Sequence, residues 1–213
     1  TLTVNGREIP ATQNGWQLLR TNASLPMTLS SSMPWQIGFI NIERPGRGVT
    51  VSAMGINGAQ LSQWSKWRPG MWEDLAQTKA DLIILAYGTN EAFSGNLDIS
   101  STERTWRNYI RQIKNTLPNA GILILGAPES LKTAYGSCGN RPVLLSEVQQ
   151  MQQRVARDEK IMFWSWQDAM GGACSMKSWM AQGLAAKDGV HFSAQGYETA
   201  ADKLADSLIR FAQ

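Results

Sequence analysis

Apolar side chains follow two different patterns along this sequence, and the change falls near residue 45. Beyond it, short apolar runs alternate with longer segments in which apolar side chains recur every three or four positions. The runs have the length of buried strands, and the segments between them have the period of amphipathic helices. The predicted strands are 48–55, 81–88, 121–128 and 161–166. Strands interleaved with helices predict an α/β fold, in which helices cover both faces of a parallel sheet.

The first 45 residues show no helical period. TLTV and REI flank Asn5-Gly6, a dipeptide that tolerates positive φ, so they predict a hairpin. The further strand-like runs are WQLLRT (16–21), MTLSSSM (27–33) and WQIGFINIE (35–43). Together they predict β-structure that is too short to close a sandwich by itself. Because the sequence opens directly on a strand-like run, we expect it to begin inside a β-structure.

The residues that could carry chemistry follow the predicted strands. Gly58 comes after the first strand, Asn90 after the second and Glu129 after the third. Asp188 and His191 lie in the loop before the last predicted helix. Parallel sheets carry their sites just beyond the carboxyl ends of the strands. We therefore expect these residues to gather on one rim of the sheet.

His191 is the only histidine, and Asp188 lies three positions before it in a glycine-containing loop. A neutral imidazole moves protons near pH 7, and a carboxylate on its far nitrogen fixes its tautomer and orientation. The pair therefore predicts a general base and its orienting partner, although a surface histidine near a helix start explains the spacing equally well. Ser193 is better explained as the N-cap of the last helix than as a nucleophile.

Gly58 and Asn90 offer a backbone N–H and a side-chain N–H on the same predicted rim. These are the donors that an oxyanion hole needs when charge develops on a tetrahedral intermediate. Taken singly, both residues are more common in turns.

Three tryptophans, Trp64, Trp67 and Trp72, follow closely behind Gly58. They could form a platform for a sugar ring, but packing against the sheet is the favoured interpretation because aromatic side chains are usually buried. Glu129 fits either a pocket lining or a loop surface, and the sequence does not decide between them.

Composition excludes several classes of function. The formal charge of +3 is spread along the chain, which gives nucleic-acid binding little support and leaves a weak attraction to an anionic polymer such as cell-wall material. No run approaches the ~20 apolar residues of a membrane span. With one histidine and no Cys-x-x-Cys pair, we expect no metal and no other cofactor. Cys138 and Cys174 each lie in a Gly/Ser-flanked loop, which fits one disulfide in an oxidising compartment or two free thiols.

Three short motifs resemble the blocks of the SGNH (GDSL-type) hydrolases. SAMGINGAQ, YGTNEA and DGVHFS occur in that family's order, and the resemblance runs from about residue 48 to the end. The longer stretches GINGAQLSQW, GTNEAF, GAPES and AAKDGVHFS look like the peptidoglycan O-acetylesterases of the neisserial type. This implies a three-layer α/β/α, flavodoxin-like hydrolase domain over 46–213. Those enzymes carry an inserted β-sandwich, carbohydrate-binding-like module, and 1–45 would be its C-terminal tail.

By this resemblance, His191 is the general base, Asp188 orients it, and Gly58 (backbone) and Asn90 (side chain) are oxyanion donors. Glu91 stands where the family often has Asp, a small departure with no expected effect on the donor. The implied reaction is serine-dependent hydrolysis of an acetyl ester, in the periplasm or cell envelope of a Gram-negative bacterium.

The family's Gly-Asp-Ser nucleophile motif occurs nowhere in the sequence. The serine run 30–32 is no substitute, because it lies in the β-rich part and lacks a strand-to-helix turn. Family sheets have five parallel strands with the nucleophile strand inside, and four are predicted here, so the strands at 48–55 and 81–88 would face an unfilled slot. We therefore expect a C-terminal piece cleaved within the inserted module, inactive alone, that pairs with a separate N-terminal fragment bearing Gly-Asp-Ser.

Three functions are consistent with these features. The favoured one is an esterase that removes O-acetyl groups from the muramic acid C6 hydroxyl of peptidoglycan, through an acyl-serine intermediate. The second keeps the chemistry but acts on acetylxylan, a lipid or a small ester. The third is a non-catalytic carbohydrate-binding remnant in which the Asp188–His191 pair no longer acts.

Overall fold

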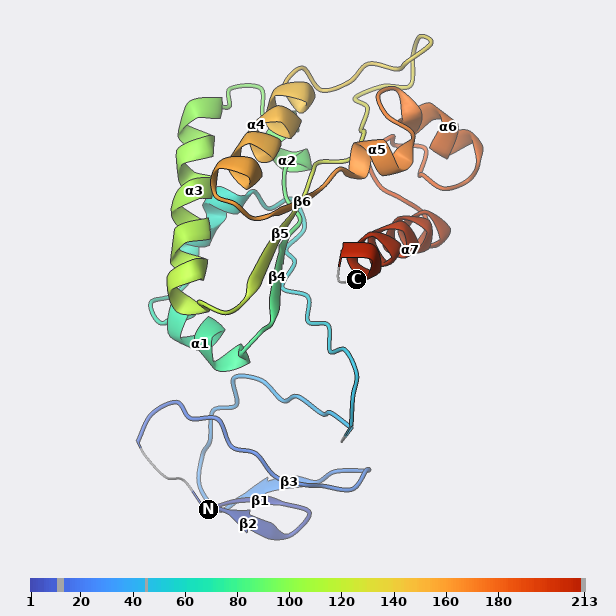
Figure 1. Ribbon diagram of the computed structural model, residues 1–213. Coiled ribbons are helices and arrows are strands. Elements are labelled where there is room, and N and C mark those ends of the chain that lie inside the picture. Colours follow the sequence, from blue (N-terminus) through green and yellow to red (C-terminus); the bar gives the residue numbers. More distant parts are fainter. Residues whose placement is uncertain (11–13, 45, 212–213) are drawn as a thin grey trace. The chain divides into compact units, whose positions relative to one another are not determined.

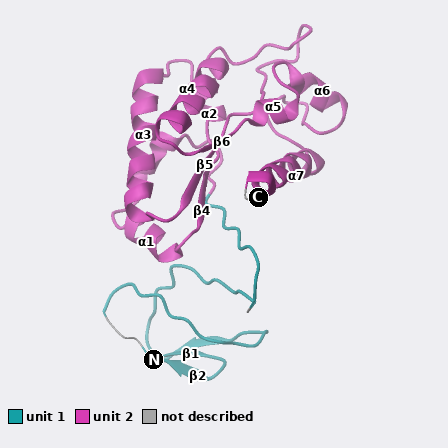
Figure 2. Ribbon diagram, viewed as in Figure 1, with its two compact units in different colours: residues 1–54 teal, residues 55–213 magenta. Residues whose placement is uncertain are grey.

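The structure is a computed structural model that describes residues 1–10, 14–44 and 46–211. The chain forms two compact units, Thr1–Met54 and Gly55–Gln213, coloured separately in Figure 2. None of the helices among the described residues is both long and apolar enough to span a bilayer. The assignment of residues 1–45 to the tail of an inserted module remains a prediction.

The first unit holds a three-stranded antiparallel sheet in the order β2-β1-β3. The strands are β1 (Leu2–Val4), β2 (Arg7–Ile9) and β3 (Leu29–Ser31). The hairpin between β1 and β2 forms as predicted, because Asn5 and Gly6 adopt the positive φ values of 49° and 78° that a tight turn requires.

Two of the strand-like runs in this unit do not form strands. Residues 16–21 and 35–43 have an irregular backbone, and Ile37, Phe39 and Ile40 are each more than half exposed. Their alternating apolar pattern was read as strand, but a strand also requires a neighbour to accept its backbone bonds. Within the run at 27–33, Leu29–Ser31 form β3 by pairing with β1.

The second unit is built on a parallel sheet in the order β4-β5-β6. Its strands are β4 (Leu82–Leu85), β5 (Gly121–Leu125) and β6 (Met162–Trp164). Figure 1 shows α3 (Ile99–Thr116) and α4 (Leu145–Asp158) on one side of the sheet and α7 (Ala194–Phe211) on the other. This confirms the α/β class and the helix–sheet–helix order. The remaining elements are η1 (Leu61–Lys66), α1 (Met71–Thr78), α2 (Thr89–Phe93), α5 (Trp166–Met170) and α6 (Ser175–Ala181).

The main core lies between the sheet and helices α3 and α4. Trp106, Ile110 and Ile113 recur at spacings of four and three on α3, and all are buried. Met151 and Val155 on α4 are fully buried in the same cluster, against the aliphatic side chains of β4 and β5. The helical period in the sequence therefore identified the buried faces of α3 and α4 correctly. The apolar face of α7 is more exposed, with Tyr197 and Phe211 at 48% and 76%.

The predicted strand at 48–55 does not form. These residues have an irregular backbone, and Val49 and Val51 are 92% and 86% exposed. The sheet of the second unit thus has three strands rather than four. A parallel strand is stable only between or beside bonded neighbours, and no described segment pairs with this run. On the other side of the expected slot, Ile84 of β4 is 43% exposed although it lies in a parallel sheet.

Cys138 and Cys174 form a disulfide, which confirms the first of the two sequence alternatives. The bond joins the long loop after β5 to the residue that precedes α6, across 36 positions of sequence. It therefore closes a loop that contains α4, β6 and α5.

Replacing both cysteines with serine should lower the free energy of unfolding by about 2–4 kcal/mol, because the unfolded chain regains the entropy of the opened loop. Urea denaturation followed by circular dichroism measures this change. Reductant should move the wild-type midpoint toward that of the variant and leave the variant unchanged. Equal midpoints for oxidised wild type and variant would contradict the expectation.

Candidate active site

Asp188 and His191 form a hydrogen-bonded pair, with 2.7 Å between Asp188 Oδ2 and His191 Nδ1. The second carboxylate oxygen, Oδ1, accepts from the backbone N–H groups of Val190 at 2.8 Å and His191 at 3.0 Å. These bonds, the ring bond first, lower the pKa of Asp188 to about 2. The carboxylate is therefore ionised at neutral pH and holds the ring by Nδ1. Because the His191 side chain is 72% exposed, Nε2 is open to a reacting group.

The loop that carries this pair is fixed against the segment after β5. Leu131 N donates to Gly189 O at 2.8 Å, and Ala186 N donates to His191 O at 2.8 Å. Gly189 has φ +71°, and a Cβ there would lie 3.0 Å from the Leu131 Cβ, so the close approach requires glycine. The loop that carries the base is thus attached to the segment that follows β5.

Ser193 caps α7, as expected. Its Oγ accepts from Gly196 N at 3.1 Å and donates to Gly183 O at 2.7 Å. The preceding residue, Phe192, is buried and stacks on Trp166 with 5.3 Å between ring centroids. These contacts anchor the C-terminal side of the His191 loop.

Gly58 and Asn90 belong to two loops that are bonded to each other. Asn90 Nδ2 donates to Ala59 O at 2.9 Å, and Gln60 Nε2 donates to Asn90 O at 3.2 Å. Gly58, with φ +76°, lies in the turn directly before these residues. Asn90 lies in the first turn of α2, just beyond β4. The structure therefore brings the two predicted oxyanion donors into neighbouring positions at the carboxyl end of β4.

Gln152 of α4 ties the ends of β4 and β5 together. Its Oε1 accepts from Ala127 N at 2.8 Å, and its Nε2 donates to Tyr87 O at 2.7 Å. A Cβ at Gly88 would lie 2.7 Å from Gln152 Nε2 and 2.8 Å from Ala127 Cβ. Only glycine fits there, so Gln152 and Gly88 together set the spacing between the two loops. No local pattern in the sequence marks this amide as buried.

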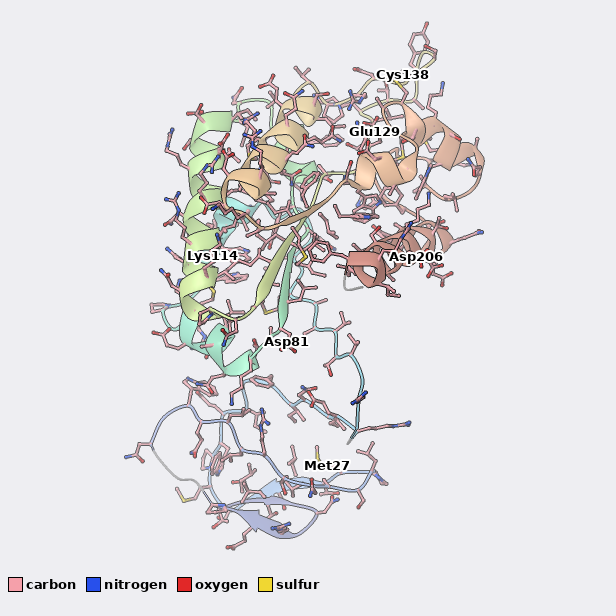
Figure 3. All side chains as sticks on the ribbon, in the orientation of Figure 1. Met27, Asp81, Lys114, Glu129, Cys138 and Asp206 are labelled. Carbon is pink, nitrogen blue, oxygen red and sulfur yellow. A yellow bond between two sulfur atoms is a disulfide. The ribbon has the colours of Figure 1, made fainter. Side chains whose placement is uncertain are left out.

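Glu129 is fully buried, so it does not lie on a loop surface. Its carboxylate is bonded to Arg141 Nη2 at 2.7 Å, to Gln167 Nε2 at 2.5 Å and to the backbone N–H of Cys174 at 3.0 Å. Figure 3 labels it beside α5, with Cys138 farther out. Glu129 therefore connects the loop after β5 to α5 and to the disulfide.

The three tryptophans form one aromatic cluster. Trp64 is buried, stacks on Trp67 with 4.9 Å between centroids, and lies 6.2 Å from Trp72. Its Nε1 donates to Tyr87 OH at 2.8 Å. Trp64 thus packs against the sheet, while the half-buried Trp67 and Trp72 also line a pocket of about 270 Å³ with Tyr109.

Within the described part of the chain, no three His, Cys, Asp or Glu side chains gather closely enough to hold a metal ion. The described residues offer a carboxylate-held imidazole on the loop before α7 and N–H donors on the loops that carry Gly58 and Asn90. A site of this kind can transfer protons and stabilise an oxyanion.

The model of the GDSL-like lipase/acylhydrolase family matches residues 30–199. This chain belongs to that family. A solved structure of a peptidoglycan O-acetylesterase is 66% identical, with a TM-score of 0.92, and the match covers 99% of this chain and 60% of that one. The chain thus spans about three fifths of that protein's length. A search among curated proteins found no match.

Two more distant structures share the fold of this family member. The acetyl xylan esterase AlAXEase is 16% identical, with a TM-score of 0.57 and coverage of 72% of this chain and 78% of that one. The acetyl-xylooligosaccharide esterase Axe2 from Geobacillus Stearmophilus is 17% identical, with a TM-score of 0.52 and coverage of 72% and 67%. At these identities the likeness concerns the fold alone.

Proposed function

We propose that this chain is part of a serine esterase that removes O-acetyl groups from peptidoglycan, at the C6 hydroxyl of muramic acid. The observation that carries the proposal is the 2.7 Å pair of Asp188 and His191, in a chain that is 66% identical to a peptidoglycan O-acetylesterase. A disulfide fits the oxidising cell envelope, where such a substrate lies.

In the proposed reaction, His191 Nε2 takes the proton of a serine hydroxyl as the serine attacks the acetyl carbonyl. Asp188 keeps the ring in the tautomer that leaves Nε2 free. The Gly58 N–H and Asn90 Nδ2 donate to the oxyanion. His191 then gives this proton to the departing sugar oxygen, which leaves as a hydroxyl, and the acetyl group remains on the serine. In the second half, His191 deprotonates a water molecule as it attacks the acetyl carbon, and returns the proton to the serine oxygen as acetate is released.

We further propose that the serine comes from a separate N-terminal fragment of the same polypeptide that bears Gly-Asp-Ser. No such motif occurs in this sequence. Two observations support the proposal. The run at 48–55 has no pairing partner among the described residues, and Ile84 of β4 is 43% exposed. A strand of the fragment that pairs with both segments would complete a five-stranded sheet. Residues 1–45 would then be the tail of the inserted β-sandwich module.

The test measures acetate release from O-acetylated peptidoglycan by this chain alone and together with the serine-bearing fragment, with labelling by a serine-directed phosphonate in parallel. We expect release and a labelled Gly-Asp-Ser peptide only when both pieces are present. If this chain alone releases as much acetate as the two pieces together, the proposal that the serine comes from the fragment is wrong. If the pair releases no acetate and takes no label, the chain is a carbohydrate-binding remnant. Faster release from acetylated xylan than from peptidoglycan would favour the second substrate class.

A further inference from the structure

We infer that Glu91 is a positioning residue that holds the two oxyanion donors, Gly58 and Asn90, in register. The inference rests on the proposed esterase function and adds a residue to it. The resemblance to the family predicted only that a glutamate in place of the usual aspartate has no effect on the donor. The structure instead places the Glu91 carboxylate at the junction of the two loops that carry the donors.

Glu91 bonds to two segments that are far apart in sequence. Its Oε1 accepts from the backbone N–H of Leu61 at 2.9 Å, and its Oε2 accepts from the backbone N–H of Gly88 at 2.9 Å. The side chain is only 1% exposed, so water cannot accept from either N–H group in place of the carboxylate. Each carboxylate oxygen therefore has a separate donor to satisfy, one on each loop.

The bond to Leu61 distinguishes this arrangement from an ordinary helix cap. A glutamate at the third position of α2 commonly accepts from the N-cap residue, and the bond from Gly88 N is of that kind. Leu61 is 30 positions away and opens η1. A capping role alone does not require a bond to that segment.

Three hydrogen bonds join residues 59–61 to residues 90–91. Besides the one from Leu61 to Glu91, Asn90 Nδ2 donates to Ala59 O and Gln60 Nε2 donates to Asn90 O. The Asn90 amide has two N–H groups, and one of them is used by Ala59. This bond fixes the orientation of the amide and therefore of its second N–H group. Gly58 lies one residue before the bonded stretch. Of the three bonds, the one to Glu91 is the most buried.

Burial raises the pKa of Glu91, while the N–H bonds from Leu61, Glu91 itself and Gly88 act in the opposite direction. The N–H bonds therefore favour the charged carboxylate, which accepts hydrogen bonds, in a site that water does not reach. A glutamine at this position keeps the shape but replaces one acceptor oxygen with an NH₂ group, which cannot accept from an N–H.

Glu91→Gln should lower kcat by about 10- to 100-fold, because a small displacement of pre-organised donors weakens transition-state stabilisation. KM should change by less than about threefold, since the oxyanion donors act on the transition state more than on the bound ester. The assay uses this chain with its serine-bearing fragment and O-acetylated peptidoglycan. Hydrogen exchange of the Leu61 and Gly88 amides, read by NMR, should be faster in the variant.

A double-mutant cycle with Asn90→Ala separates positioning from a general loss of stability. If Glu91 acts through the donors, Glu91→Gln should lower kcat much less in the Asn90→Ala background than in wild type. The matched control is Asp98→Ala, which removes the N-cap of α3, where Asp98 Oδ1 accepts from Ser101 N at 3.1 Å. It should lower Tm and leave kcat unchanged.

Each result bears on the inference. The inference is wrong if Glu91→Gln leaves kcat unchanged, or if the double variant loses the product of the two single fold-changes. In either case, activity of the wild-type pair still supports the esterase function. Absence of acetate release by the wild-type pair overturns the esterase function and this inference with it. If Glu91→Gln does not fold, Glu91→Ala replaces it: alanine favours the helix and removes both acceptor oxygens, so a loss of kcat of at least the same size is expected.

Discussion

Replacing His191 with alanine should lower acetate release by about 10³- to 10⁴-fold when this chain is combined with its serine-bearing fragment. Without the imidazole, the serine hydroxyl has no acceptor for its proton, and the sugar hydroxyl has no donor as it departs. The measurement is kcat/KM on O-acetylated peptidoglycan, with acetate determined enzymatically. Lys187→Ala, an exposed change in the same loop, is the control and should stay within about twofold of wild type, in the range of ordinary surface changes.

Asp188→Asn should reproduce most of this loss, because an amide does not hold Nδ1–H as a carboxylate does and the wrong tautomer forms. The pKa of Asp188 is lowered from 3.8 to about 2. A lowered pKa means that the stabilising bond to the ring is fully present above pH 3.8 and is lost as the pH falls through about 2. Activity that disappears on acidification above pH 3.8 therefore does not result from protonation of Asp188. Full activity of either His191→Ala or Asp188→Asn would remove the catalytic assignment.

The second large effect is expected at Asn90. Asn90→Ala should reduce kcat by about 10²- to 10³-fold and leave KM nearly unchanged, because a side-chain donor to the oxyanion is lost. Steady-state kinetics on a soluble acetyl ester and on peptidoglycan measure both constants. The matched control is Asn96→Ala, an exposed asparagine in the turn after α2. A reduction of only a few-fold would make Asn90 a turn residue whose bond to Ala59 merely joins two loops.

The features that the sequence predicted correctly are those that depend on local spacing. The alternation of apolar runs and helical periods identified β4, β5, β6, α3 and α4, because each of those elements shows its own period. The capping role of Ser193 and the pairing of Asp188 with His191 are equally local, since the partners lie within three positions of each other. Residue type and short spacing were enough for these predictions.

The features that the sequence did not predict depend on partners far along the chain. The run at 48–55 has strand composition, but strand formation requires a neighbour that the described chain does not supply. The sequence left the placement of Glu129 open and gave no sign that Glu91 is buried. Each is buried and bonded to residues up to 45 and 30 positions away, respectively. The role of Gln152 could not be predicted for the same reason, since its amide bonds to backbone groups that follow two different strands. Burial of a polar side chain is a property of the assembled fold.

The unfilled strand positions have a consequence for handling this chain in solution. Val49 and Val51 lie on a solvent-exposed run of strand composition, and Ile84 on β4 is also accessible. Sheet edges with unpaired N–H and C=O groups are templates for other molecules, and β-branched side chains make such additions more favourable. Copies kept apart from the serine-bearing fragment would therefore add to one another edge to edge and precipitate. The proposed fragment would then protect this chain from aggregation, as a chaperone acting from a second polypeptide, as well as supply the nucleophile.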